Sequence, residues 1–171
     1  MDSLEEKFVG VWSLKAWTVI KPDGSKTHPF SGNIEGLLIY HPSRWMSATI
    51  MQKNRKNVSD NRSDISKINH KLNNKTEIEL DSNLLEIIKD FFLASNGYVS
   101  YAGEFNVDDI NVYHNLKISL LPQWAGTILT RKYKFSSQNN ILNLTAELNG
   151  FKDSLKSVSY THLRAHETDR H

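Results

Sequence analysis

Residues 98–135, YVSYAGEFNVDDINVYHNLKISLLPQWAGTILTRKYKF, decide the fold class of this chain of 171 residues. Alternation of apolar and polar side chains places them on opposite faces of a β-strand. The runs that alternate in this way are 98–107, 111–120 and 127–135. Asp108-Asp109 and Pro122-Gln123 separate the runs and are residue types typical of turns. The stretch therefore predicts three consecutive antiparallel strands.

Further strands are expected on both sides of this stretch. The additional runs with strand patterning are 12–20, 35–40, 45–51 and 141–148. Pro22-Asp23-Gly24 follows the first of them and has the residue types of a tight turn. A chain of this length fits a single domain. Short strands at regular spacing predict an all-β fold, an antiparallel up-and-down barrel or a sandwich.

The middle of the chain differs in character from these strands. Residues 52–81 are rich in Asn, Lys, Asp and Ser, and they are expected to form a polar loop insertion. A helix is expected at 82–96, because Ser82 can cap it and Asn96-Gly97 can end it. Its apolar residues recur at helical spacing and are Leu84, Ile87, Ile88, Phe91 and Phe92. We expect this one helix to cover a mouth of the barrel.

Residues 157–171 resemble a translated sequencing adapter, so the domain itself is expected to span residues 1–156. The tail contains His162, His166 and Glu167, whose helical spacing imitates a metal site. The adapter resemblance excludes them from functional reasoning. Residues 157–162 also alternate like a strand. The tail is therefore predicted to complete the barrel edge in place of a native closing strand lost after about Lys156.

The composition excludes several functions. With 21 basic and 19 acidic residues the net charge is only +2, so no nucleic-acid partner is expected. There is no cysteine, the histidines outside the tail lack metal-ligand spacing and no phosphate loop occurs, so no metal or cofactor is expected. No apolar stretch approaches the roughly 20 residues of a membrane span, and the acidic start is not a secretory signal. A cytoplasmic location without membrane insertion is expected, whereas the sequence does not define the oligomeric state.

Several short motifs follow one another in an order that carries a family resemblance. They are Gly10-Val-Trp12, Gly36-Leu-Leu-Ile-Tyr40-His-Pro with Met46-Ser47, Tyr101-Ala-Gly103-Glu-Phe105, Val112-Tyr-His114, Ser119-Leu-Leu-Pro122-Gln-Trp124-Ala-Gly126 and Arg131. On these motifs, residues 8–155 resemble the bacterial and fungal lipocalin-like domain family. The resemblance implies a lipocalin-like antiparallel up-and-down β-barrel with an internal cavity. It does not imply one shared activity.

His114 is the first candidate for a polar contact inside the barrel. Counting in steps of two places it on the same face as Val112, Leu116 and Ile118. Burial on that apolar face favours the neutral imidazole, which can donate and accept a hydrogen bond at once. His114 is therefore a candidate ligand contact and the candidate catalytic residue. The alternative is a structural histidine paired with a neighbouring hydroxyl or carbonyl group.

Arg131 is the second candidate, because it shares an apolar face with Leu129, Tyr133 and Phe135. A guanidinium on such a face needs a partner. One interpretation is a structural latch, in which Arg131 stacks on Trp12 as in classical lipocalins. The other is an anchor for a carboxylate or enolate of a ligand.

Large aromatic and sulfur-containing side chains supply the remaining candidates for the cavity wall. Side chains of this kind suit a cavity for a flat or terpenoid-like molecule, although each can equally be core filling. The candidates are Trp45, Met46, Tyr101, Phe105 and Trp124.

Three functions remain open at this point. The leading hypothesis is binding of a small hydrophobic or amphipathic molecule in the barrel. The alternative is a cofactor-free isomerase, cyclase or hydratase acting on a polyketide- or terpenoid-like substrate, with His114 as proton shuttle. A filled barrel that acts only as an interaction module is the third, and a cavity too small for any ligand would indicate it.

Overall fold

The computed structural model describes residues 4–59, 62–74, 82–148 and 150–159. The chain divides into two compact units. Residues 1–53 and 99–171 belong to a barrel unit, and residues 54–98 belong to a helical unit.

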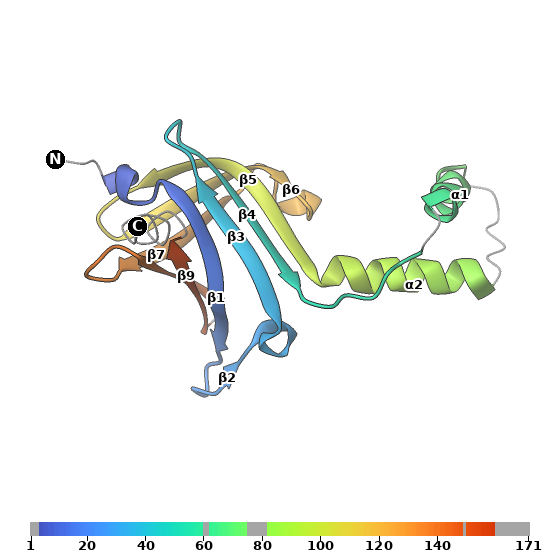
Figure 1. Cartoon of the computed structure of the whole chain (residues 1–171), viewed down its shortest axis with the longest axis horizontal. Coiled ribbons are helices and arrows are strands. Elements are labelled where there is room, and N and C mark those ends of the chain that lie inside the picture. The colour runs from blue at the N-terminus through green and yellow to red at the C-terminus, as the bar shows by residue number, and fades with distance from the viewer. Residues whose placement is uncertain (1–3, 60–61, 75–81, 149, 160–171) are drawn as a thin grey trace, which may run out of the picture. The chain divides into compact units, whose positions relative to one another are not determined.

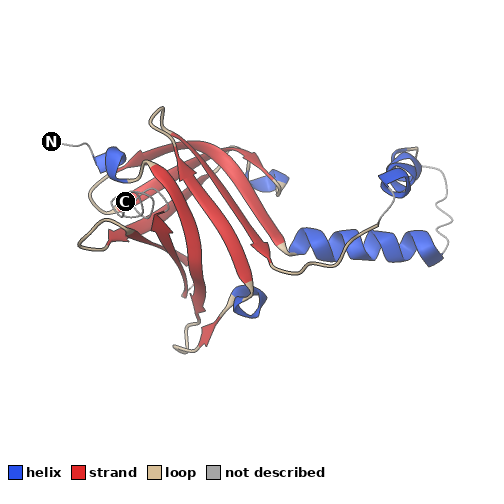
Figure 2. Cartoon of the chain, viewed as in Figure 1, coloured by secondary structure: helices blue, strands red, loops and turns tan. Residues whose placement is uncertain are grey.

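The barrel unit is an antiparallel sheet that closes on itself (Figure 2). Its strands are β1 (Gly10–Ile20), β2 (Lys26–Thr27), β3 (Ile34–Tyr40), β4 (Trp45–Gln52), β5 (Tyr98–Val107), β6 (Asn111–Ser119), β7 (Ile128–Phe135), β8 (Ile141–Leu148) and β9 (Phe151–Ser159). The short 3-10 helices are η1 (Leu4–Lys7), η2 (Pro29–Gly32) and η3 (Pro122–Trp124). From β3 to β9 each strand pairs with the next along the chain, and pairing of β1 with both β3 and β9 closes the barrel. The predicted all-β, up-and-down barrel is confirmed.

The closing strand β9 continues across Lys156, and the expected loss of a native strand after that residue stays a prediction. Residues on both sides of Lys156 form one strand, which pairs with β8 and with β1. Leu155 and Ser157 are 7% and 3% exposed and face the interior. Alternation indicated this strand only from residue 157 onward, because residues 151–156 carry only two apolar side chains. The tail residues His162, His166 and Glu167 lie outside the described residues.

The contribution of the tail to β9 can be tested by truncation. A chain that ends at Lys156 loses the pairs Leu14–Ser157 and Ser13–Val158 as well as the burial of Ser157. We expect its free energy of unfolding to fall by about 1–3 kcal/mol, from lost hydrogen bonds and lost apolar burial. Urea denaturation measures this change, with a chain that ends at Ser159 as the control. Equal stability of the two chains would show that the tail adds nothing to the barrel.

A cluster of aromatic rings closes one end of the barrel. Phe8 follows η1, is fully buried and lies at its centre. The ring centroids of its neighbours lie 4.9–6.3 Å away, and these neighbours are Tyr40, Phe105, Tyr133 and Phe135. Figure 1 shows η1 at this end, beside the start of β1. We call these five residues the aromatic cluster. Because the cluster fills this end, space for a ligand must lie farther along the barrel.

A β-bulge in the β5–β6 pair changes which side chains face the interior. Ala102 pairs with Ile118, but Gly103 pairs with Leu116, so Lys117 is the extra residue. His114 and Leu116 face inward as predicted, whereas Ile118 is 66% exposed. Sequence alternation placed Ile118 on the inner face, and this was wrong because the bulge shifts the period by one residue.

The helical unit contains α1 (Arg62–Asn73) and α2 (Ser82–Asn96). Helix α2 confirms the predicted helix, whereas α1 lies within the segment expected to be a loop. Three buried residues, Ile68, Leu84 and Ile87, form its small core. The apolar residues Ile65, Ile68 and Leu72 of α1 lie three and four positions apart, a helical spacing that the polar composition concealed.

The helical unit also contains an ion pair between Lys56 and Asp90, at 2.6 Å. Within the described part of the chain, no helix has the length and apolar character needed to cross a membrane. The expected position of α2 over the barrel mouth stays a prediction.

Candidate functional site

Unpaired polar atoms mark the candidate site. Among the described residues, the buried side-chain nitrogen and oxygen atoms without a hydrogen-bond partner are His114 Nδ1, Arg131 Nε and Arg131 Nη1. Buried polar groups in proteins are nearly always paired, so each exception needs an explanation. All three belong to two residues that the sequence selected, and both side chains lie in the barrel interior.

His114 lies in the middle of β6 and is fully buried. Its Nε2 atom is 2.7 Å from the hydroxyl of Tyr40, on β3, and the tautomer decides which of the two donates. Burial lowers the pKa of the His114 imidazole to about 3, and the positive charge of Arg131 adds to the shift. His114 is therefore neutral near pH 7.

Tyr40 was not among the candidates chosen from the sequence. It is 1% exposed, and burial raises the pKa of its phenol well above the usual range, with a further contribution from Tyr101. The positive charge of Arg131 lowers the pKa of Tyr40 and so opposes this shift. Strand alternation with Leu38 could have placed Tyr40 inside, but the pairing with His114 joins residues 74 positions apart. Only the closed barrel brings the two together.

Arg131 lies on β7 opposite Val112 of β6, and the alternation of β7 turns its side chain inward. His114 is two residues beyond Val112 on the same face, so the imidazole and the guanidinium are diagonal neighbours. Arg131 makes no hydrogen bond or ion pair with any described residue. The site thus combines one cationic group with two neutral hydrogen-bonding groups.

Within the described part of the chain, Arg131 and Trp12 do not make the stacking contact of the predicted latch. The Trp12 indole donates from Nε1 to the backbone carbonyl of Phe8, at 2.7 Å. Its ring lies 5.9 Å from that of Phe135. Trp12 is therefore anchored at the end filled by the aromatic cluster, and the Arg131 guanidinium is left without this partner.

A small cavity of about 20 Å³ lies inside the barrel. Arg131, Tyr101 and Ser157 line it, and they are the polar part of its wall. The apolar part of the wall includes Leu14, Leu38, Ala48, Ile50, Leu144 and Leu155. The volume corresponds to roughly one water molecule. The sequence identified Arg131 and Tyr101, but it missed Ser157 because that residue was assigned to the tail.

The other predicted wall residues lie in different places. Met46 and Phe105 are 3% and 1% exposed and belong to the barrel core, but they do not line the cavity. Trp124 is half-buried, with its ring 6.1 Å from that of Tyr101. Trp45 is 45% exposed. Trp45 and Met46 are adjacent on β4 and therefore point to opposite faces, so only one of them could face inward.

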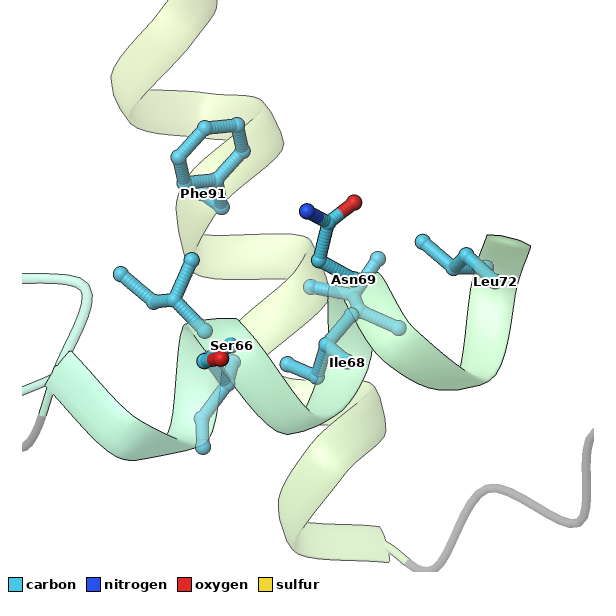
Figure 3. A pocket seen from close by; sticks show the side chains of 8 residues that line it. Ser66, Ile68, Asn69, Leu72 and Phe91 are labelled. Carbon is cyan, nitrogen blue, oxygen red and sulfur yellow. The ribbon is translucent and has the colours of Figure 1, made fainter. Parts of the chain in front are cut away.

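A larger apolar groove of about 680 Å³ lies in the helical unit, between α1 and α2 (Figure 3). Ile65, Ile68, Leu72 and Phe91 are among its lining residues, together with the polar Ser66 and Asn69. The larger of these two cavities thus lies in the helical unit, whereas the unpaired buried polar atoms lie in the barrel. Because specific sites rely on a few converging polar groups, we place the candidate site in the barrel, where the unpaired buried atoms are.

The lowered pKa of His114 has a measurable consequence. The unfolded chain binds this proton near pH 6.5, whereas folded His114 binds it only near pH 3. Stability is therefore lost as the pH falls from 6.5 towards 3, by about 1.4 kcal/mol per pH unit from this group. Urea denaturation across this range should show a shallower pH dependence for His114→Gln than for the wild type. A ring titration of His114 near pH 6.5 in ¹⁵N NMR spectra would contradict this.

The fold and the site together define a closed antiparallel barrel of the ligand-binding type with a partly polar interior. The family model of the lipocalin-like domain matches residues 9–164. The chain belongs to this family. No curated protein matches it. A solved structure, an uncharacterised protein from Bacteroides eggerthii DSM 20697, is similar at 13% identity and a TM-score of 0.41, over 90% of this chain and 99% of that one.

Proposed function

We propose that this protein binds a small hydrophobic or amphipathic molecule in the barrel, with Arg131 and His114 as its polar contacts. One observation carries the proposal, namely the unpaired buried atoms His114 Nδ1, Arg131 Nε and Arg131 Nη1. A buried donor or acceptor without a partner costs about 1–3 kcal/mol. A bound molecule with a polar end would supply the missing partners, and its apolar part would contact the leucine-rich wall.

The ligand-free cavity is smaller than such a molecule, so binding requires interior side chains to move. Leu14 is suited to this movement because it is only partly buried. It packs over Gly36, where an added Cβ would lie 3.1 Å from Leu14 Cβ and Cδ2. A change of the Leu14 rotamer would alter the wall of the cavity without moving the backbone.

A pair of matched variants tests where binding occurs. Ala48→Val adds two methyl groups to the cavity wall, whereas Ser66→Val changes the groove of the helical unit. In native mass spectrometry with medium-chain alcohols and fatty acids, we expect saturable binding of one molecule to the wild type. Ala48→Val should weaken it about tenfold or more, equivalent to about 1.4 kcal/mol, and Ser66→Val should leave it unchanged. Loss of binding only in Ser66→Val would place the ligand in the groove and contradict the proposal.

Catalysis is the second candidate, as a cofactor-free isomerase, cyclase or hydratase acting on a polyketide- or terpenoid-like substrate. The observation in its favour is the 2.7 Å contact between Tyr40 and His114, two titratable groups within hydrogen-bond reach. Against it, an imidazole with a pKa of about 3 is a weak base at neutral pH. A bound compound that leaves the protein chemically unchanged supports binding. Turnover that is lost in Tyr40→Phe while affinity is kept would support catalysis.

The small cavity favours the third candidate, a filled barrel that serves only as an interaction module. In a filled barrel, however, unpaired buried donors only destabilise the core, and apolar side chains would be expected in their place. Arg131 and His114 therefore argue for an occupant. A barrel that binds none of the compounds offered would favour the interaction module.

A further inference from the structure

We infer that the molecule held by the barrel carries a carboxylate, and that the Arg131 guanidinium binds this carboxylate inside the barrel. The inference rests on the proposed function and specifies the chemical class of the ligand. It starts from the charge of the barrel interior, which the described residues leave unbalanced.

Arg131 is half-buried, and its Nε and Nη1 atoms lie in the interior without a buried counter-charge. The buried polar and charged residues of the described chain are Ser13, Asp90, His114 and Ser157. Asp90 is the one carboxylate among them, and it belongs to the helical unit, where it pairs with Lys56. A guanidinium stays protonated in proteins, and an unpaired buried charge is strongly unfavourable. A ligand with one negative charge would restore the balance.

The shape of the donor group favours a carboxylate over other anions. A guanidinium presents its N–H donors in one plane, and its edges match the two oxygen atoms of a carboxylate. In each edge Nη2 lies beside either Nε or Nη1. Nε and Nη1 of Arg131 both lack a protein acceptor, so each edge has an unpaired donor. Tyr101 and Ser157 line the same cavity and offer hydroxyl groups for the remaining lone pairs of such a ligand.

The surroundings favour a single charge attached to an apolar body. His114 is neutral near pH 7, and the Tyr40 phenol keeps its proton, so Arg131 alone supplies charge. Leu38, Leu144 and Leu155 line the cavity beside it. A doubly charged phosphate would leave excess negative charge among leucine side chains, which is unfavourable. A carboxylate with an aliphatic or aromatic remainder satisfies both parts of the wall.

The test compares hexanoate with 1-hexanol, which has the same chain length but no charge. The readout is the Nε–H signal of Arg131 in ¹H–¹⁵N NMR spectra of the full chain at pH 7, at constant ionic strength. We expect hexanoate to shift this signal saturably and to bind at least about tenfold more tightly than 1-hexanol. Arg131→Lys keeps the charge but loses the planar donor edge, and it should abolish this preference. Arg44→Lys is the matched control, because Arg44 is exposed and pairs with Glu5.

Each other outcome has a defined meaning. Equal affinity for hexanoate and 1-hexanol overturns the carboxylate inference and leaves the proposed function intact. Binding of neither compound contradicts both. A saturable shift of the Arg131 signal by chloride or phosphate that hexanoate cannot reverse would show a general anion site and overturn the inference. The wild-type comparison needs no variant, so it remains decisive even if Arg131→Lys fails to fold.

Discussion

Phe8→Ala is expected to lower the free energy of unfolding by about 3–5 kcal/mol. Phe8 is fully buried, and its ring centroid lies 4.9 Å from that of Tyr133 and 5.0 Å from that of Phe135. Removing the ring exposes no new surface to water but leaves a void among aromatic neighbours, which lose their dispersion contacts. Because Phe8 lies just before β1, the effect would show that the N-terminal segment is part of the barrel core.

Urea denaturation followed by circular dichroism measures this change. Phe151→Ala is the control, because this substitution removes a ring of the same size from a residue that is 46% exposed. We expect the control to lose less than about 1 kcal/mol, as surface substitutions usually do. Equal losses in both variants would mean that the aromatic cluster does not hold the barrel end together.

Gly103→Ala is expected to destabilise the chain by about 3 kcal/mol or more, at the upper end of overpacking effects. An added Cβ would overlap the backbone carbonyl oxygen of Asn115 on the neighbouring strand. Backbone atoms within a sheet cannot rotate away as a side chain can. The strain therefore falls on the bulge, which sets the inward direction of Tyr101 on one side and of Leu116 on the other.

Gly36→Ala is the matched control for this prediction. Gly36 also lies inside a strand, but its added Cβ would meet side-chain atoms of Leu14 and Ile50, at 3.1 Å. Contacts at 3.1 Å require these neighbours to give way by only a few tenths of an ångström, so we expect a smaller loss of stability than in Gly103→Ala. A Gly103→Ala variant as stable as Gly36→Ala would contradict the close approach of β5 and β6 at the bulge.

Period-two alternation predicted an all-β fold, a barrel or a sandwich, and the inward direction of two central polar residues. The family resemblance selected the barrel. His114 and Arg131 alternate with apolar residues on β6 and β7, and both face inward. Alternation failed where the backbone departs from regular pairing, as at Ile118 beyond the bulge. It also failed where the pattern is weak, as in β9, whose pairing with β1 is a long-range property of the closed barrel.

The site itself could be predicted only in part. Arg131 and His114 stood out in the sequence because polar residues are unusual on apolar strand faces. That their buried nitrogen atoms lack hydrogen-bond partners depends on every residue around them and is seen only in the structure. The sequence left Trp12 and a ligand as alternative partners of Arg131, and it did not indicate that the Trp12 indole donates to the Phe8 carbonyl. Likewise, the pairing of Tyr40 with His114 depends on a contact between distant strands. Such contacts cannot be read from local patterns.

Native mass spectrometry with organic extraction can show whether the barrel holds a small molecule. The full chain would be purified from cells rich in small metabolites, together with Ala48→Val as the variant with a blocked cavity. We expect a discrete apolar or amphipathic compound bound at one molecule per chain, present in the wild type and strongly reduced in Ala48→Val. A wild-type mass that shows no ligand, and that stays unchanged after a broad challenge with lipids and polyketides, would show that the barrel does not bind such a molecule.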